Sequence, residues 1–127
     1  MTRNLAELQV EERVRFDPSK LEALCHELGE EGAERVIAHG FEQIALKVAR
    51  IKAFAQAGAI DELLKVSRSL ARVARRIGME TLAEVAHDVR RSASRGDPVA
   101  LAATLARLGR IGDHSVNAIW TLEDISI

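Results

Sequence analysis

Apolar residues recur at intervals of three and four along most of this chain, and glycine or Asp-Pro interrupts the pattern at several points. An α-helix has about 3.6 residues per turn, so this spacing lines apolar side chains along one face of a helix. Such a face is stable only when it packs against another apolar surface. We therefore expect several amphipathic helices that bury their apolar faces against one another.

The composition agrees with a helical domain. Alanine, leucine, valine, glutamate and arginine dominate the 127 residues, whereas aromatic residues make up 3% and only two prolines occur. This mixture favours helices, while sheets favour threonine and aromatic residues. A chain of this length can build one core and is too short for two ordinary domains, so we expect residues 1–127 to form a single domain.

The stretch "FDPSKLEALCHELG" contains the signals of a short helix at residues 17–28. Asp17 is a good N-cap, and Pro18 suits the first helical position because the N–H that it lacks would have no partner there. Gly29 is typical of a helix end. We expect the apolar stripe of this helix to be buried, the lone cysteine included: Leu21, Leu24, Cys25 and Leu28.

The same rules predict four longer helices, at about residues 31–56, 61–77, 80–94 and 99–122. Gly40 lies inside the first of them and should weaken it by on the order of 1 kcal/mol relative to alanine. Asp97 is the predicted N-cap of the last one. Glycine marks the ends of the other three, at Gly58, Gly78 and Gly96.

Short links between consecutive helices favour antiparallel neighbours. The predicted fold is therefore all-α: an antiparallel up-and-down four-helix bundle, with the short helix at residues 17–28 covering one end. Residues 1–16 are predicted to be a loosely attached N-terminal helix. The expected core includes the apolar positions of the third and fourth helices, Leu63, Val66, Leu70, Val73, Ile77, Leu82, Val85, Ala86, Val89 and Ala93.

Positive charge is concentrated in the middle of the chain. The net charge of the whole is -1, but residues 65–95 carry eight basic and three acidic side chains, a local charge of +5. Such a segment attracts acidic partners. At about 100° per residue, Arg68, Arg72 and Arg75 form one row on the third helix, with Lys65 one turn before them. This row is either a solvated helix face or a binding face.

The order and spacing of these helices resemble the histidine-containing phosphotransfer (Hpt) domain of bacterial phosphorelays, over roughly residues 16–122. The family signature is a helix that reads His-x-Leu-Lys-Gly-x-x-x-x-Leu-Gly, with small variations. Gly78, Ile77 and Leu70 match its scaffold positions. The phospho-accepting histidine position falls on Arg68, the lysine position on Ala71 and the small glycine position on Arg72.

The resemblance implies a protein that binds without transferring phosphate. A guanidinium stays protonated and has no nucleophilic lone pair, so Arg68 cannot replace the reactive imidazole. The expected function is that of a pseudo-phosphotransfer domain in two-component signalling: no enzyme, no cofactor, and a response-regulator receiver domain or histidine kinase as partner. The residues expected to bind that partner are Lys65, Arg68, Ala71, Arg72 and Arg75.

One alternative is an active phosphotransfer protein that uses His87. The stretch "AHDVRRSASRG" also imitates the signature, with His87 as acceptor, Arg90 as the cation and Gly96 as the terminal glycine. Against this, Arg91 occupies the small position, and one long helix follows where the family has two. The simpler interpretation makes His87 a partly exposed helix residue.

A second alternative is a basic helical module that binds nucleic acid through residues 65–95. The segment has no aromatic residue for stacking on bases, and the flanking parts of the chain are acidic, which argues against it. A third is assembly. An apolar patch near the C-terminus could pair two copies of the chain into a homodimer, through Ile119, Trp120, Leu122 and Ile125.

The remaining features predict no metal and no membrane. A single cysteine cannot form an internal disulfide, and the four histidines show no His-x-x-x-His pair of metal-ligand type. No apolar run approaches the roughly 20 residues that a membrane-spanning helix needs. The N-terminal residues include acidic side chains where a signal peptide needs an apolar core, so we expect a cytoplasmic protein.

Overall fold

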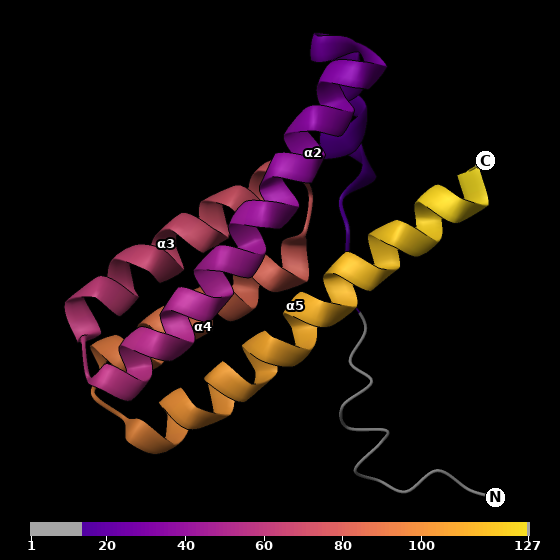
Figure 1. The fold of residues 1–127 in the computed structure, drawn as a ribbon. Helices are drawn as coiled ribbons and strands as arrows, with labels where there is room; N and C mark the ends of the chain where they lie inside the picture. The colour runs from indigo at the N-terminus through magenta and orange to yellow at the C-terminus, as the bar shows by residue number, and fades with distance from the viewer. Residues whose placement is uncertain (1–13, 127) are drawn as a thin grey trace, which may run out of the picture.

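The computed structural model describes residues 14–126, with side chains up to Ser115. Within this part of the chain there are four α-helices and no strand, so the predicted all-α four-helix bundle is confirmed. Helix α3 packs against both α2 and α4, while α5 packs mainly against α4 (Figure 1). The helices are α2 (Pro18–Ala57), α3 (Ile60–Arg76), α4 (Glu80–Ser94) and α5 (Pro98–Ser126).

The predicted N-terminal helix is wrong where it can be checked. Residues 14–16 are not helical, and residues 1–13 lie outside the described residues. Phe16 instead pairs with Met79 in an isolated antiparallel bridge, and the Asp17 N–H donates to the Gly78 carbonyl at 2.8 Å. These backbone bonds attach the start of the described chain to the turn between α3 and α4.

Helix α2 begins as predicted. The Asp17 carboxylate accepts hydrogen bonds from the Ser19 N–H at 3.0 Å and from Ser19 Oγ at 2.5 Å, with Pro18 in the first helical turn. The hydrogen bond from the Ser19 hydroxyl lowers the pKa of Asp17. A carboxylate at this place satisfies a backbone N–H that has no partner within the helix.

The two helices predicted at residues 17–28 and 31–56 are both present within α2, on either side of a kink at Gly29 where the backbone is not helical. Gly29 has φ 76° and ψ 170°, which glycine adopts without steric cost, and helical hydrogen bonding resumes directly after it. The burial predicted for Cys25 and Leu28, however, is wrong, because both are exposed. Before the break only Leu24 is buried, so a single position of this short segment reaches the core.

Helix α4 is the most enclosed of the four. It packs between α3 and α5, and the inward face predicted for it is confirmed. On α3 the prediction holds for Leu63, Leu70 and Ile77, whereas Val66 and Val73 are only half-buried. The predicted α4 residues that are buried are Leu82, Val85, Ala86, Val89 and Ala93.

Glycine ends the helices where predicted. Gly58, Gly78 and Gly96 all have positive φ. At Gly78, with φ 82°, an added Cβ would lie 2.6 Å from the Asp17 carbonyl oxygen, so this turn requires glycine. Asp97 caps α5, because its carboxylate accepts from the Ala100 N–H at 3.0 Å. These turns fix the ends of α3 and α4.

Gly40 has a packing role that the sequence does not reveal. It is buried, and an added Cβ would lie 3.1 Å from Ile77 Cδ1. The absence of a side chain therefore lets α2 approach the end of α3. Gly40 lowers the helix propensity of α2, as predicted, but it also allows the two helices to pack closely.

Candidate functional site

The exposed face of α3 is basic from Lys65 onward, after the acidic first turn with Asp61 and Glu62. Its apolar side chains, Leu63 and Leu70 among them, are buried, so helical geometry turns the opposite side to solvent. Within the described part of the chain, none of the cations on this face takes part in an ion pair. These exposed residues are Lys65, Arg68, Arg72, Arg75 and Arg76.

Ala71 does not belong to this face. It was predicted to bind the partner with Lys65 and the arginines, but it is 6% exposed and belongs to the core. A position three residues after Arg68 lies about 60° around the helix from it, on the side toward the buried seam. A partner at the surface would therefore contact the arginines and not Ala71.

A groove between α3 and α4, which we call the α3–α4 groove, gathers four arginines. Its volume is ≈ 390 Å³. Arg68 reaches it from the middle of α3, and three more arginines come from the last turns of α4 and the residue that follows. The described residues that line it are Leu64, Arg68, Arg90, Arg91, Ser94 and Arg95.

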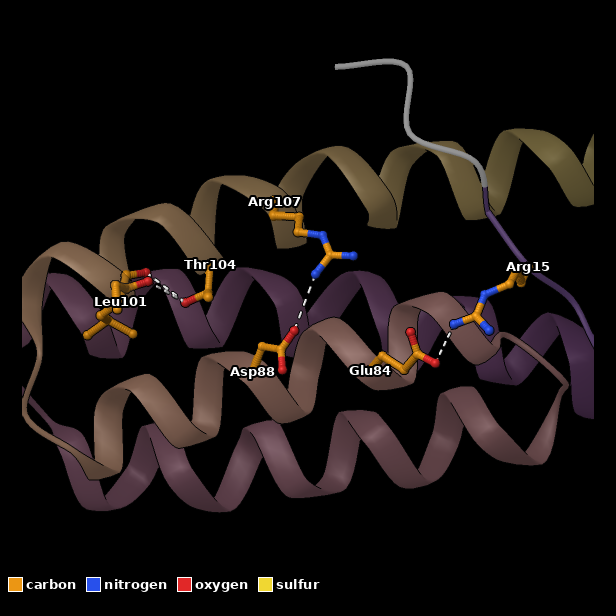
Figure 2. Close-up of polar contacts among 7 residues, drawn as sticks. Arg15, Glu84, Asp88, Leu101, Thr104 and Arg107 are labelled. Carbon is orange, nitrogen blue, oxygen red and sulfur yellow. Dashed lines mark hydrogen bonds and ion pairs between the residues drawn. The ribbon is translucent and has the colours of Figure 1, made fainter. Parts of the chain in front are cut away.

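Among the described residues, no carboxylate lines the α3–α4 groove. Two acidic residues of α4, Glu84 and Asp88, form ion pairs with other parts of the chain. Asp88 pairs with Arg107 of α5 at 3.2 Å, and Glu84 pairs with Arg15 (Figure 2). Helix α4 therefore directs its carboxylates toward other elements. Its arginines are left beside Arg68 without an acidic partner in the described part of the chain.

A second groove, the α2–α3 groove, lies on the other side of α3 and has a volume of ≈ 640 Å³. Its apolar part is formed by Val36, Gly40, Val73 and Ile77, and its cations include Arg72 and Arg76 from α3. No carboxylate lines this groove either. The other lining residues are Leu28, Gly32, Arg35, His39, Gln43, Lys47 and Ser69.

The predicted arginine row is thus shared between two places. Arg68 lines the α3–α4 groove and Arg72 lines the α2–α3 groove, while Lys65 and Arg75 line neither. On a helical projection Arg72 lies about 40° from Arg68, which is enough to turn the two side chains toward different neighbouring helices. The structure places Arg68 in one groove with Arg91 and Arg95, which the predicted row on α3 did not include.

The contribution of α2 was missed from the sequence. Arg35, His39, Gln43 and Lys47 follow one another at four-residue intervals and line the α2–α3 groove together. Such spacing places polar side chains along one helix face, so the signal was present. The net charge hid it, because acidic residues outnumber basic ones in the first half of the chain.

His87 lies on α4 and is half-buried, which agrees with its interpretation as a partly exposed helix residue. Arg90 Nη2 lies 3.3 Å from His87 Nδ1. Because a guanidinium only donates, Nδ1 is the acceptor in this contact. His87 lines neither groove.

No cluster of three or more potential metal ligands occurs among the described residues, and Cys25 stands alone on the surface. No helix in that part of the chain combines the length and the apolar character that a membrane crossing needs. The predicted homodimer patch, Ile119 to Ile125, falls where the side chains are outside the described residues.

The chemistry available at the α3–α4 groove is binding through charge and hydrogen bonds. Guanidinium groups donate up to five hydrogen bonds and remain protonated, so they attract and orient anions but do not attack them. The α3–α4 groove suits a compact anion because arginines form most of its lining. The α2–α3 groove, larger and partly apolar, suits the side chains of a protein surface.

Comparison with known proteins adds no relative to this description. No family model matches the chain, and searches of curated proteins and of solved structures give no match.

Proposed function

We propose that this protein is a non-catalytic docking module, a pseudo-phosphotransfer (Hpt-like) domain of phosphorelay signalling that binds an acidic protein surface through α3. The partner is a response-regulator receiver domain or a histidine kinase. One observation carries the proposal: Arg68 is exposed and has no ion-pair partner in the described part of the chain, at the position where the resembled family has its reactive histidine.

The surroundings of Arg68 support the proposed correspondence. Leu70 and Ile77, which match the scaffold positions of the signature, are fully enclosed, and Gly78 ends the region with positive φ. The links between consecutive helices are short, which favours the antiparallel up-and-down arrangement of an Hpt-like bundle. Scaffold positions of the signature serve packing, and its histidine position serves chemistry. This chain has matching residues at the scaffold positions and an arginine at the histidine position.

Docking would use the α2–α3 groove together with the exposed arginines of α3. Apolar side chains of the partner would contact Val36 and Val73, and its carboxylates would pair with Arg35 and Arg72 around them. A charge-assisted hydrogen bond contributes about 1.5–3 kcal/mol when shielded from water and far less at an open rim. The apolar part of the groove is therefore what allows the arginines to contribute.

The test of this proposal has a transfer arm and a binding arm. Phosphorylated receiver domains from the native cell are incubated with the protein, and we expect no acid-labile phosphate on it. The Arg68→Ala, Arg72→Ala double variant should bind the same receiver domains at least about tenfold more weakly, because two charge-assisted contacts are lost. Circular dichroism checks that the bundle remains folded.

A matched control removes the same charge elsewhere. Arg50 and Lys52 are exposed on α2 and line neither groove, so Arg50→Ala with Lys52→Ala should leave binding close to that of the unmodified protein. Equal weakening of receiver binding in both variants would show that the effect reflects net charge alone, and it would contradict a docking face on α3. Acid-labile phosphate that disappears in His87→Asn would instead establish His87 as an acceptor.

A further inference from the structure

We propose that the α3–α4 groove is a binding site for a multiply charged phosphate group, the diphosphate or triphosphate of a small molecule. Four guanidinium groups from two helices line one depression of ≈ 390 Å³. That volume lies within the range of small-molecule sites, about 300–1,000 Å³. The site lies outside the α2–α3 groove and shares only Arg68 with the proposed docking face, and it does not depend on the identity of the protein partner.

The charge of the groove is not balanced within the described molecule. The guanidinium groups of Arg68, Arg91 and Arg95 have no ion-pair or hydrogen-bond partner there, and the guanidinium of Arg90 contacts the His87 ring. Asp88 and Glu84 are held by Arg107 and Arg15, away from the groove lining (Figure 2). Four like charges that share a groove repel one another, and a bound anion removes that repulsion.

Helix-end electrostatics do not account for the arrangement. Cations near the end of α4 interact favourably with the helix dipole, which is a sufficient structural reason for Arg91. Arg68, however, lies in the middle of α3, far from either end of that helix. Its presence in the same groove needs another reason, and a shared anionic ligand supplies one.

Arginine is the side chain best suited to phosphate. The planar guanidinium donates two parallel hydrogen bonds to a pair of phosphate oxygens, and it keeps its charge over the whole physiological pH range. The Ser94 hydroxyl adds a further donor at the groove, and Leu64 offers apolar contact to the rest of a ligand. No aromatic side chain lines the groove, so stacking on successive bases of a nucleic acid is not provided.

The experiment uses sodium tripolyphosphate as probe and isothermal titration calorimetry as readout, at constant ionic strength with sulfate as the comparison anion. The unmodified protein should bind one tripolyphosphate and prefer it clearly to sulfate. Arg91→Gln with Arg95→Gln should weaken this binding at least about tenfold, since two charge-assisted contacts are lost. Arg50→Gln with Lys52→Gln, which removes the same charge outside both grooves, should change it less than about twofold.

A second readout locates the ligand. Amide resonances of Ser94 and its neighbours and the methyl resonances of Leu64 should shift on titration, whereas those of Val36 and Val73 in the other groove should not. Equal weakening in the two double variants, shifts spread over all basic surfaces, or no preference over sulfate would each overturn the proposal. So would a short single-stranded RNA that displaces the probe and binds more tightly through the same arginines.

The outcome is separable from that of the proposed function. Arg91 and Arg95 lie outside the α2–α3 groove, so their replacement should weaken tripolyphosphate binding and leave receiver docking measurable. A protein that binds the anion but no receiver domain would refute the docking proposal alone. One that binds a receiver domain but not the anion would refute this proposal alone.

Discussion

The two grooves beside α3 differ in chemistry although they share one helix. The α3–α4 groove is lined mostly by arginine, whereas the α2–α3 groove combines cations with Val36, Gly40 and Ile77. To each groove α3 contributes exposed arginine and a partly buried aliphatic residue: Arg68 with Leu64 in the first, and Arg72 and Arg76 with Val73 in the second. The difference comes from the neighbouring helices, so the ligand preference of a charged helix face depends on what packs beside it.

The largest effect is expected from charge reversal around the α2–α3 groove. Arg35→Glu with Arg72→Glu replaces attraction by repulsion toward an acidic partner, and receiver binding should fall by about 100-fold or more. Tripolyphosphate binding in the α3–α4 groove should change less than about threefold, because neither residue lines it. Surface plasmon resonance and calorimetry measure the two affinities. A parallel loss of both would show that the grooves act as a single positive surface.

An intermediate effect is expected from filling the α2–α3 groove at Gly40. An added Cβ lies 3.1 Å from Ile77 Cδ1, so Gly40→Leu overpacks the contact between α2 and α3 and should cost about 1–3 kcal/mol of unfolding free energy. Urea denaturation measures that cost. The folded variant should also lose receiver binding and keep tripolyphosphate binding. Unchanged stability together with unchanged docking would contradict the assigned packing role of Gly40.

The smallest effect is expected at the ion pair between Arg107 and Asp88. Both side chains are about a third exposed, at 32% and 39%, so Arg107→Ala should lower the unfolding free energy by less than about 1 kcal/mol. Asp88 then loses its partner on α5 and gains freedom to compensate the charge of the α4 arginines. Tripolyphosphate affinity should fall modestly, by about twofold. Stronger binding in this variant would count against the role assigned to the engaged carboxylates.

The sequence predicted those parts of the fold that depend on local spacing. The inward face of α4, with Val85 and Val89, follows from a period of 3.6 residues, and Gly78 and Gly96 end their helices as expected. Burial was predicted wrongly for Cys25, because periodicity shows that a helix has an apolar face but not whether another element covers it.

The candidate site was predicted only in part. Arg68 and Arg72 are exposed as expected, yet they line different grooves, and Ala71 between them is buried. Arg35 belongs to the site and was missed, since it lies more than thirty residues before Arg72 in an acidic part of the chain. Positions this far apart in sequence meet only through helix packing, about which local patterns say nothing.

By itself, the amino-acid sequence determined the helices, most of their ends and the positive charge of α3. Backbone hydrogen bonding, glycine conformation and side-chain periodicity act over a few residues, and all three can be read locally. Only the tertiary structure decided that Arg68 lies beside the α4 arginines and Arg72 beside α2. Long-range packing against two different helices divides one row of charges between two sites, and that packing depends on the shapes of all the buried side chains together.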